Sequence, residues 1–421
     1  MQRYDTYKDS GVKWLGEIPE HWEVKRLASY FTERRVKVSD KDFEPLSVTK
    51  LGVFPQWENV AKTNDGDNRK LVKKGDFVIN SRSDRKGSSG ISDRDGSVSL
   101  INIVLQPRKT ILAQFSNYLL KSYRFIEEYY RNGRGIVADL WTTRYDEMKM
   151  IKLAIPPLKE QEAIANYLDT ATAKIDSAIA QQQKMIDLLN ERKQIIINNA
   201  VTKGLNPNAK MKDSGVEWIG EIPEGWDTCA LKKKAKVILG KMLSNNPTNK
   251  YKYICAKDVH YGEIDTSDLK EMSFTHEERQ LYEVKKGDML IVEGGAGAGG
   301  CAIVKEDLKN IYIQNSIMIV RGAENLLNDY LCFFMQSINQ KGYIEYICNK
   351  ATIPHFTKEK VGAVIIPLPP FKKQVEIVDY LNTAIAPIDD AIKNCQNQIS
   401  LLQERKQIII NEVVTGKEKV G

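Results

Sequence analysis

Residues 8–22 read KDSGVKWLGEIPEHW, and residues 212–226 read KDSGVEWIGEIPEGW. The two stretches agree at 12 of 15 positions, at an offset of 204 residues. Agreement of this length does not arise by chance, so the chain contains an internal duplication. Because solenoid repeats run only roughly 20–50 residues, each copy must instead be a module of domain size.

Two further stretches recur later in each copy. The sequence VKKGD stands at 72–76 and again at 284–288, and ERKQIIIN stands at 191–198 and again at 404–411. Each copy therefore has the same order: an arm that carries tryptophans, a region rich in strand patterns, and a helical end. The order predicts an α+β fold of two pseudo-symmetric mixed α/β domains, joined by two long helices in an antiparallel coiled coil. We place the domains at 1–156 and 206–368, and the helical segments at 157–205 and 369–421.

The globular regions contain alternating and continuous apolar runs bounded by Gly, Ser and Asp. These runs predict strands at 77–79, 98–105, 289–292, 302–304 and 311–320. Longer amphipathic patterns predict helices at 116–131 and 326–347.

The helical segments each open with a Pro-Pro pair and end near a glycine, Gly204 or Gly416. Pro387 should interrupt the second one, which predicts a short helix at 371–384 and a long one at 388–415. The first copy should match, with its long helix at 175–201. Apolar residues at heptad-like spacing predict a coiled-coil interface formed by Ile175, Met185, Leu189, Ile196, Ile388, Leu402 and Ile409. The alternative is that each helix packs only on its own domain.

Composition is that of a globular chain, with 42% hydrophobic and 28% charged residues. The 62 basic and 55 acidic side chains give a net charge of +7, and residues 1–155 hold 28 and 21 of them, so the whole excess lies there. This excess permits a polyanionic partner without requiring one.

The absence of a membrane-length apolar run or a secretory signal predicts a cytoplasmic protein. Six cysteines without C-x-x-C spacing predict reduced thiols.

Catalytic and cofactor patterns are not found. The four histidines lack metal-ligand spacing, and there is no phosphate-binding loop of the Walker type. The glycine-rich stretch 294–300 lies between two strand patterns, which predicts a hairpin loop rather than a dinucleotide site, where a helix must follow. The equivalent loop at 81–90 does not share its glycine spacing. We therefore expect no catalytic, cofactor-binding or metal-binding residue in this chain.

The repeated motifs together resemble the DNA specificity subunit of type I restriction-modification enzymes. The resemblance covers nearly the whole chain and includes the arm, the K-x-G-D turn, and a P-P-[LF]-x-x-Q stretch with Gln161 and Gln374. It implies that two target recognition domains each read one half of a split double-stranded DNA target. It also implies that the helices set the gap between the halves and dock two methyltransferase subunits, with motor-nuclease subunits joining for restriction.

In that family the specificity subunit is not the catalyst. S-adenosylmethionine, ATP and Mg²⁺ are thereby expected on partner subunits. The alternative is a coiled-coil scaffold or interaction protein without sequence-specific DNA binding, which a comparison of DNA methylation with and without the gene would separate.

Residues that read different half-sites must differ between the copies, so the DNA-contacting candidates come from unlike loops. Arginine can bind guanine through two hydrogen bonds, and the other side chains can bind phosphates or base edges. In the first domain the candidates are Arg82, Ser83, Arg85, Lys86, Arg131, Arg134, Thr142, Thr143 and Arg144. In the second they are Lys241, Asn245, Asn246, Lys250, Lys350, Thr352 and His355. Solvated loop residues are the equally weighted alternative.

Shared residues cannot distinguish half-sites. Trp14, Trp22, Trp218 and Trp226 are therefore assigned to packing of the arm rather than to base stacking. The Lys73-Lys74 and Lys285-Lys286 pairs fit either phosphate contacts or a turn before a strand.

Overall fold

A computed structural model describes residues 2–56, 66–135, 141–243, 249–295, 297–348 and 355–420. The chain divides into two compact units. Unit 1 comprises residues 1–183 and 396–421, and unit 2 comprises residues 184–395. Four candidate residues, Asn245, Asn246, Lys350 and Thr352, lie outside the described residues.

In its described residues, unit 1 contains short strands and three short α-helices, together with parts of two long ones. Its strands are β1 (Tyr7–Asp9), β2 (Glu17–Pro19), β3 (Glu23–Arg26), β4 (Phe31–Glu33), β5 (Lys37–Val38), β6 (Leu46–Val48), β7 (Val53–Pro55), β8 (Arg69–Val72), β9 (Phe77–Asn80), β10 (Ser89–Ile91), β11 (Gly96–Val98), β12 (Asn102–Pro107) and β13 (Lys152–Ile155). Its short helices are α1 (Ala113–Lys121), α2 (Tyr123–Arg131) and α3 (Tyr145–Met148).

Unit 2 follows the same plan. Its strands are β14 (Met211–Asp213), β15 (Glu221–Pro223), β16 (Asp227–Ala230), β17 (Ala235–Leu239), β18 (Lys250–Ile254), β19 (Val259–His260), β20 (Glu263–Ile264), β21 (Lys270–Ser273), β22 (Met289–Val292), β23 (Cys301–Ile303), β24 (Ile311–Ile313), β25 (Ile317–Gly322) and β26 (Ile365–Leu368). Its short helices are α5 (His276–Tyr282), α6 (Asn328–Gln340), α7 (Tyr343–Ile347) and α8 (Lys358–Ala363).

The central sheet has the same strand order in both units. It runs β10-β9-β12-β4 in unit 1 and β23-β22-β25-β17 in unit 2, with all neighbours antiparallel. The arm hairpins β1–β2 and β14–β15 also share their register. The duplication seen in the sequence is therefore a duplication of fold.

Four predicted elements are divided in the structure. Ser122 caps α2 through its side chain and separates it from α1, and Gly342, at a φ of 75°, separates α6 from α7. The predicted strands 98–105 and 311–320 are each interrupted by a turn, and they form β11 with β12 and β24 with β25. Hydrophobicity is continuous across these breaks, so the apolar pattern alone did not show them.

The two long helices are α4 (Leu158–Lys203) and α9 (Phe371–Val414), and each is continuous. The predicted division into a short and a long helix is therefore wrong in both copies. Pro387 lies inside α9 on an exposed position, where water can reach the carbonyl that its missing N–H leaves unpaired. Its neighbours Ile385 and Ile388 are buried, and their packing holds the helix on both sides of the proline.

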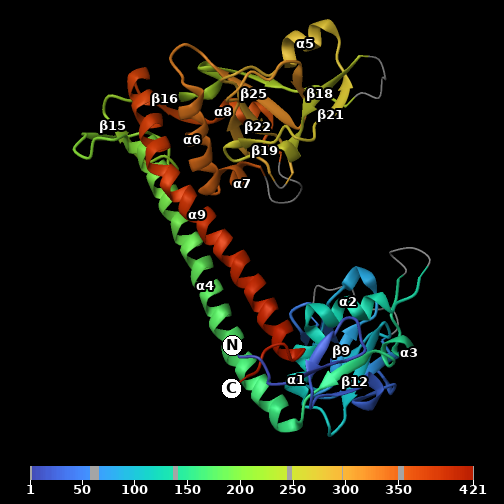
Figure 1. The fold of residues 1–421 in the computed structure, drawn as a ribbon. Coiled ribbons are helices and arrows are strands. Elements are labelled where there is room, and N and C mark those ends of the chain that lie inside the picture. The colour runs from blue at the N-terminus through green and yellow to red at the C-terminus, as the bar shows by residue number, and fades with distance from the viewer. Residues whose placement is uncertain are drawn as a thin grey trace. The chain divides into compact units, whose positions relative to one another are not determined.

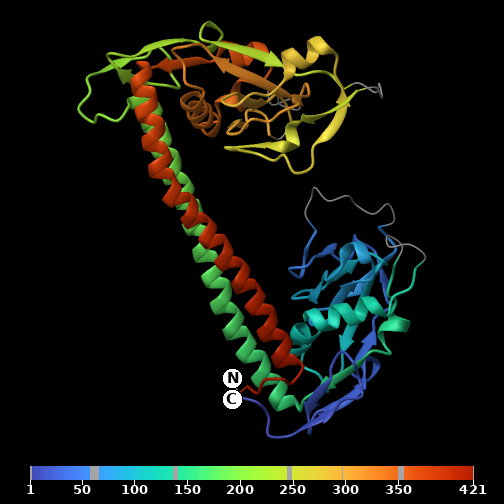
Figure 2. The same cartoon turned by 45° about the horizontal axis from the view of Figure 1, so that its top comes forward.

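The helices pair antiparallel, as predicted. In unit 1 the first part of α4 lies beside the last part of α9, and in unit 2 the reverse holds (Figures 1 and 2). Ion pairs of 2.6 Å join Asp176 to Lys406 and Asp389 to Lys193. Both members recur at an offset of 213 residues, so the duplication itself fixes the register of the pair.

The predicted interface residues fall into three groups. Ile175, Ile388 and Ile409 are buried, and a second group is partly buried, namely Leu189, Ile196 and Leu402. Met185 is 49% exposed, whereas the next residue, Ile186, is 7% exposed. The prediction for Met185 is corrected to Ile186, because the buried positions advance by alternating steps of four and three from Ile175.

Each hydrophobic core contains the ends of both long helices. The unit 1 core includes Ile164 and Leu168 from the start of α4, and Val413 and Val414 from the end of α9. The unit 2 core likewise combines the end of α4, through Ile197 and Val201, with the start of α9. The alternative in which each helix packs only on its own domain is therefore excluded.

The repeated glutamine of the P-P-[LF]-x-x-Q stretch joins each helix to its domain. Gln161 is fully buried; its Oε1 accepts from the N–H of Leu112 at 2.8 Å, and its Nε2 donates to the carbonyls of Thr110 and Pro156. Gln374 is also fully buried and makes the same three bonds to Leu327, Asn325 and Pro369. Leu112 and Leu327 are the N-cap residues of α1 and α6, so each glutamine pairs the N-cap N–H, as the N3 side chain does in a capping box.

All six cysteines are free in the structure. Within the described residues, no helix has the length and apolarity that crossing a membrane requires.

We predict that Gln161→Ala and Gln374→Ala each lower the free energy of unfolding by about 3 kcal/mol, because each leaves a buried N–H and two carbonyls unpaired. Urea denaturation followed by circular dichroism measures the change. Gln181→Ala, at an exposed position of α4, is the matched control and should change stability by less than roughly 0.5 kcal/mol. Equal effects of the three substitutions would contradict the capping role.

Candidate nucleic-acid interface

In unit 1, two segments predicted separately from the sequence lie side by side. Arg82 follows β9 and forms a β-bridge with Thr142, which also bridges to Arg134. The N–H of Ser83 donates to the carbonyl of Trp141 at 3.1 Å. The loop after β9 is thus held against the segment that precedes α3.

Unit 2 builds the same arrangement with different side chains. Gly294 follows β22 and forms a β-bridge with His355, and the N–H of Phe356 donates to the carbonyl of Glu293 at 2.7 Å. Gly294 matches Arg82 at an offset of 212, and His355 matches Thr142 at an offset of 213. The backbone scaffold is therefore repeated while the side chains that it presents are not.

The glycine-rich loop belongs to this scaffold. It joins β22 to β23, which pair antiparallel with Met289 opposite Ile303. The prediction of a hairpin loop is confirmed, since a strand and not a helix follows the glycines.

Most candidate cations of unit 1 have a carboxylate partner close by. The pairs are Arg85–Asp84 at 3.6 Å, Lys86–Glu127 at 2.6 Å, Arg131–Glu128 at 2.7 Å and Arg134–Glu147 at 3.4 Å. These ion pairs lie at or near the surface, where they are weak and exchange readily with another anion.

Arg82 and Arg144 differ from the other candidates. Both are exposed, and within the described residues neither guanidinium group has a carboxylate partner. The carbonyl of Arg82 accepts a hydrogen bond from the Tyr130 hydroxyl at 2.7 Å, which fixes its backbone.

Thr143 has a structural position instead. It is fully buried, its hydroxyl donates to the carbonyl of Tyr129 at 3.0 Å, and its own carbonyl accepts from the Tyr129 hydroxyl. We leave Thr143 out of the contacting set, because its side chain does not reach the surface.

Of the described second-domain candidates, one is held in the fold and two are exposed. Lys241 donates to Glu278 at 2.6 Å and to the carbonyl of Ser273 at 2.8 Å, so it joins β17 to α5 rather than facing solvent. Lys250 is exposed at the start of β18. His355 is exposed beside Glu293, with 3.4 Å between Nδ1 and Oε2.

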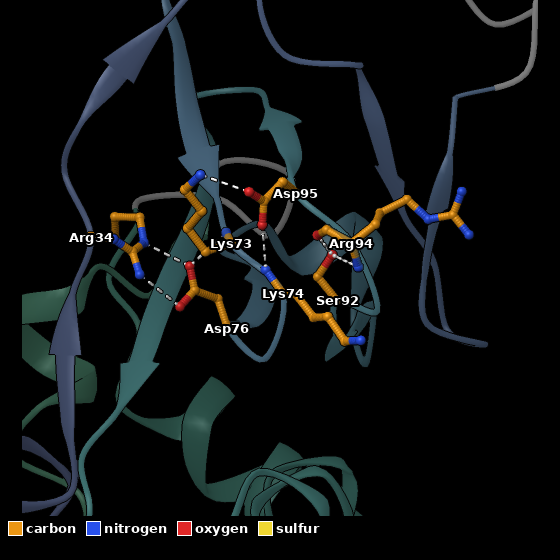
Figure 3. Close-up of polar contacts among 7 residues, drawn as sticks. All are labelled: Arg34, Lys73, Lys74, Asp76, Ser92, Arg94 and Asp95. Carbon is orange, nitrogen blue, oxygen red and sulfur yellow. Dashed lines mark hydrogen bonds and ion pairs between the residues drawn. The ribbon is translucent and has the colours of Figure 1, made fainter.

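The repeated VKKGD sequence forms a turn that leads into a central strand. Figure 3 shows the turn of unit 1, where Asp76 accepts from the N–H of Lys73 at 2.9 Å and from Arg34 at 2.7 and 3.0 Å. The hydrogen bonds from Arg34 to the Asp76 carboxylate raise the pKa of Arg34. Lys73 is itself paired with Asp95 at 2.6 Å.

The turn in unit 2 uses the same aspartate and a different arginine. Asp288 accepts from the N–H of Lys285 at 2.8 Å and from Arg321, which lies on β25. Gly75 and Gly287 have φ values of 90° and 85°, which disfavour any other residue. The motif is thus explained by turn geometry, which favours the turn interpretation of the lysine pairs over phosphate contacts.

The four repeated tryptophans lie in the hydrophobic cores or against them. Trp22 and Trp226 are 0% and 6% exposed. Trp14 packs edge-on against Phe125, and Trp218 stacks on Tyr343 with ring centroids 4.4 Å apart. This position agrees with their assignment to packing.

Sequence reasoning missed the acidic partners of the candidate cations. The spacing of Glu128 and Arg131, three residues apart on one helix, is a signal that could have shown their pair. Glu147, by contrast, reaches Arg134 only through the folding of the segment between them. Within the described residues, no group of three or more His, Cys, Asp or Glu side chains could hold a metal ion.

Comparison with known proteins gives one family. A model described as "Type I restriction modification DNA specificity domain" matches residues 19–186 and 223–401, one match in each repeat. The MjaX and EcoKI specificity subunits, from Methanocaldococcus jannaschii and Escherichia coli K12, are 24% and 22% identical. These alignments cover 98% of this chain and 98% of the first relative, and 96% and 90% for the second.

A solved structure shares the fold. It comes from a study of complex assembly and conformational transition of the type I R-M system, and superposes with a TM-score of 0.71 at 15% identity. The superposition covers 94% of this chain and 98% of the other.

Proposed function

The chain belongs to the type I restriction-modification DNA specificity family, and we propose that each of its units reads one half of a split double-stranded DNA target. This family is the DNA-recognition, non-catalytic subunit of type I systems. The observation that carries the proposal is the repeated loop scaffold, with Arg82 and Thr142 in one unit and Gly294 and His355 at the matching places in the other. The two units hold their loops with the same backbone bridges but present different side chains, as reading two different DNA half-sites requires.

We assign the helix pair to setting the number of unread base pairs between the half-sites. The support is that α4 and α9, of 46 and 44 residues, each contribute to both hydrophobic cores. Partner subunits, in this proposal, supply adenine methylation and DNA translocation, and they hold the S-adenosylmethionine, ATP and Mg²⁺. In this proposal the complex acts in the cytoplasm.

Two methyltransferase subunits have two equivalent surfaces on which to dock. Leu188 and Ile195 on α4 are 51% and 53% exposed, and the matching Leu401 and Ile408 on α9 are 64% and 52% exposed. Residues seven apart lie on one face of a helix. Each unit therefore presents one exposed apolar stripe of the same composition, as two copies of one partner require.

The function is tested by mapping methylated adenines in the genome with and without this gene. We expect deletion to remove one split motif and to leave other methylated motifs in place. An unchanged methylation pattern, with the partner methyltransferase expressed, would favour the scaffold alternative.

Replacing Arg82 tests the half-site assignment. We predict that Arg82→Ala relaxes the base preference in one half of the target only, at a loss of about 1–3 kcal/mol in binding the preferred sequence. Sequencing of DNA selected from a randomised library by the wild-type and variant complexes measures this preference. Arg94→Ala is the control, because Arg94 is exposed in the turn next to Asp76, at the opposite end of β9. A loss spread equally over all sequences, with a lower salt slope, would make Arg82 a phosphate contact instead.

The docking stripes give a second prediction. Leu188→Glu and Leu401→Glu should each weaken the binding of one methyltransferase subunit by about 10-fold or more, because a buried leucine contributes roughly 1.5–3 kcal/mol. Native mass spectrometry of the reconstituted complex counts the bound subunits. Asn190→Glu, at another exposed position of α4, controls for the added charge. Retention of two subunits by the Leu188→Glu/Leu401→Glu double variant would reject these stripes as the docking surface.

A further inference from the structure

Unit 1 contains a hollow beside Trp22. It is filled by residues 2–6, here called the N-terminal arm, which precede the β1–β2 hairpin. The ring of Tyr4 lies edge-on to Trp22 with centroids 6.2 Å apart, and 5.7 Å from the ring of His21. The Tyr4 hydroxyl donates to Glu160 Oε1 at 2.6 Å, which also accepts from Trp22 Nε1. Burial and this hydrogen bond hold the pKa of Tyr4 well above its ordinary value, so the phenol is a donor.

The arm that carries Tyr4 is held against the C-terminal tail. Gln2 forms a β-bridge with Lys419, and the Tyr7 hydroxyl donates to the carbonyl of Lys417 at 3.2 Å. The occupant of the unit 1 hollow is therefore an extended polypeptide arm that inserts one aromatic ring.

Unit 2 has the same hollow without its occupant. At the repeat offsets of 204 and 213 residues, Asn208, Gly225 and Lys373 correspond in the sequence to Tyr4, His21 and Glu160. Asn208 is exposed, and a Cβ at Gly225 would meet nothing within 4 Å. A pocket of about 290 Å³ results, lined by Gly204, Leu205, Pro223, Gly225, Trp226, Pro370, Lys373 and Ile377 among others.

Connectivity explains the difference. In unit 1 the residues before β1 pair with the C-terminal tail through Gln2 and Lys419, whereas in unit 2 residues 204–210 are the covalent link between α4 and β14. This link already runs from the helix end to the hairpin, and Leu205 and Ala209 form walls of the pocket without filling it.

The polarity of the pocket is opposite to that of unit 1. Lys373 replaces the Glu160 carboxylate, and Lys203 is a second ammonium group in the lining. Glu376 lies 2.6 Å from Lys373 and balances one of the two charges. An aromatic ring matches the apolar lining beside Trp226, and an acidic group next to it matches the remaining positive charge of Lys203 and Lys373.

We propose that the pocket beside Trp226 docks an extended arm of a partner subunit, which inserts one aromatic ring flanked by an acidic residue. Because Tyr4 fills the matching place in unit 1, each chain binds one such arm. The two units of the chain are alike in fold, but within the described residues only unit 2 offers this pocket, so the chain has one attachment point for the arm and not two.

The first experiment uses the full-length chain and a probe of known sequence. The probe is a fluorescein-labelled peptide of residues 2–7, QRYDTY, which carries Tyr4 followed by Asp5. We expect 1:1 binding by fluorescence anisotropy, weakened about 10-fold or more by Gly225→Trp, which fills the pocket. Lys372→Glu, on a neighbouring exposed lysine outside the lining, should leave binding unchanged. No binding at about 1 mM probe, or binding insensitive to Gly225→Trp, would overturn the proposal.

A charge exchange keeps the test valid if Gly225→Trp fails to fold. Lys373→Glu should weaken the QRYDTY probe several-fold and should favour a probe with Lys in place of Asp5. Equal binding of both probes to both chains would overturn the assigned polarity.

The second experiment identifies the partner. A photo-crosslinking benzoylphenylalanine at position 225 in a complex reconstituted from purified subunits should crosslink one partner copy, at a peptide with an aromatic and an acidic residue. Crosslinks only within this chain would overturn the docking role. The crosslinking experiment rests on the proposed function, because it needs the assembled complex. The peptide experiment uses this chain alone. Failure of the proposed function would therefore affect the crosslink but not the binding of the peptide.

Discussion

The structure depends on the sharing of helix ends between two hydrophobic cores. Each core is closed by the start of one long helix and the end of the other, so neither unit is complete without both repeats. The Asp176–Lys406 and Lys193–Asp389 ion pairs repeat the register on each side. Such exposed pairs add little stability, and the apolar contacts of the helix ends supply most of it.

The residues that the two copies share are almost all explained by this construction. The arm hairpin places Trp22 and Trp226 in the cores, the glutamines cap α1 and α6, and the VKKGD turn leads into the central strand. The loops after β9 and β22, and the segments bridged to them, occupy matching places but differ in their side chains. Duplication has kept the scaffold and allowed the surface that it presents to diverge, which is what reading two different sequences requires.

Patterns that depend on periodicity and repetition could be read from the sequence. The two modules, the antiparallel helices and the hairpin at the glycine-rich loop follow from them. The sequence could not show which of Met185 and Ile186 faces the partner helix. Both side chains are apolar, and only the packing of the folded helices decides between them. The continuity of α9 through Pro387 also depended on tertiary contacts, since buried neighbours outweigh the local cost of the proline.

The candidate surface was predictable in place but not in detail. Unlike loops in equivalent positions indicated where to look, and the structure brings Arg82 together with Thr142. The burial of Thr143 and the engagement of Lys241 by Glu278 arise from long-range folding that no local pattern records.

The most direct test of the account shortens the helix pair. Deleting residues 180–186 from α4 and the matching 393–399 from α9 removes one heptad from each helix, keeps the repeat register and shortens the pair by about 10 Å. Selection from DNA libraries with spacers of different lengths then measures the preferred gap. Our account predicts unchanged half-sites with a spacer shorter by about 3 base pairs, at about 3.4 Å per base pair. An unchanged spacer with unchanged half-sites would contradict it.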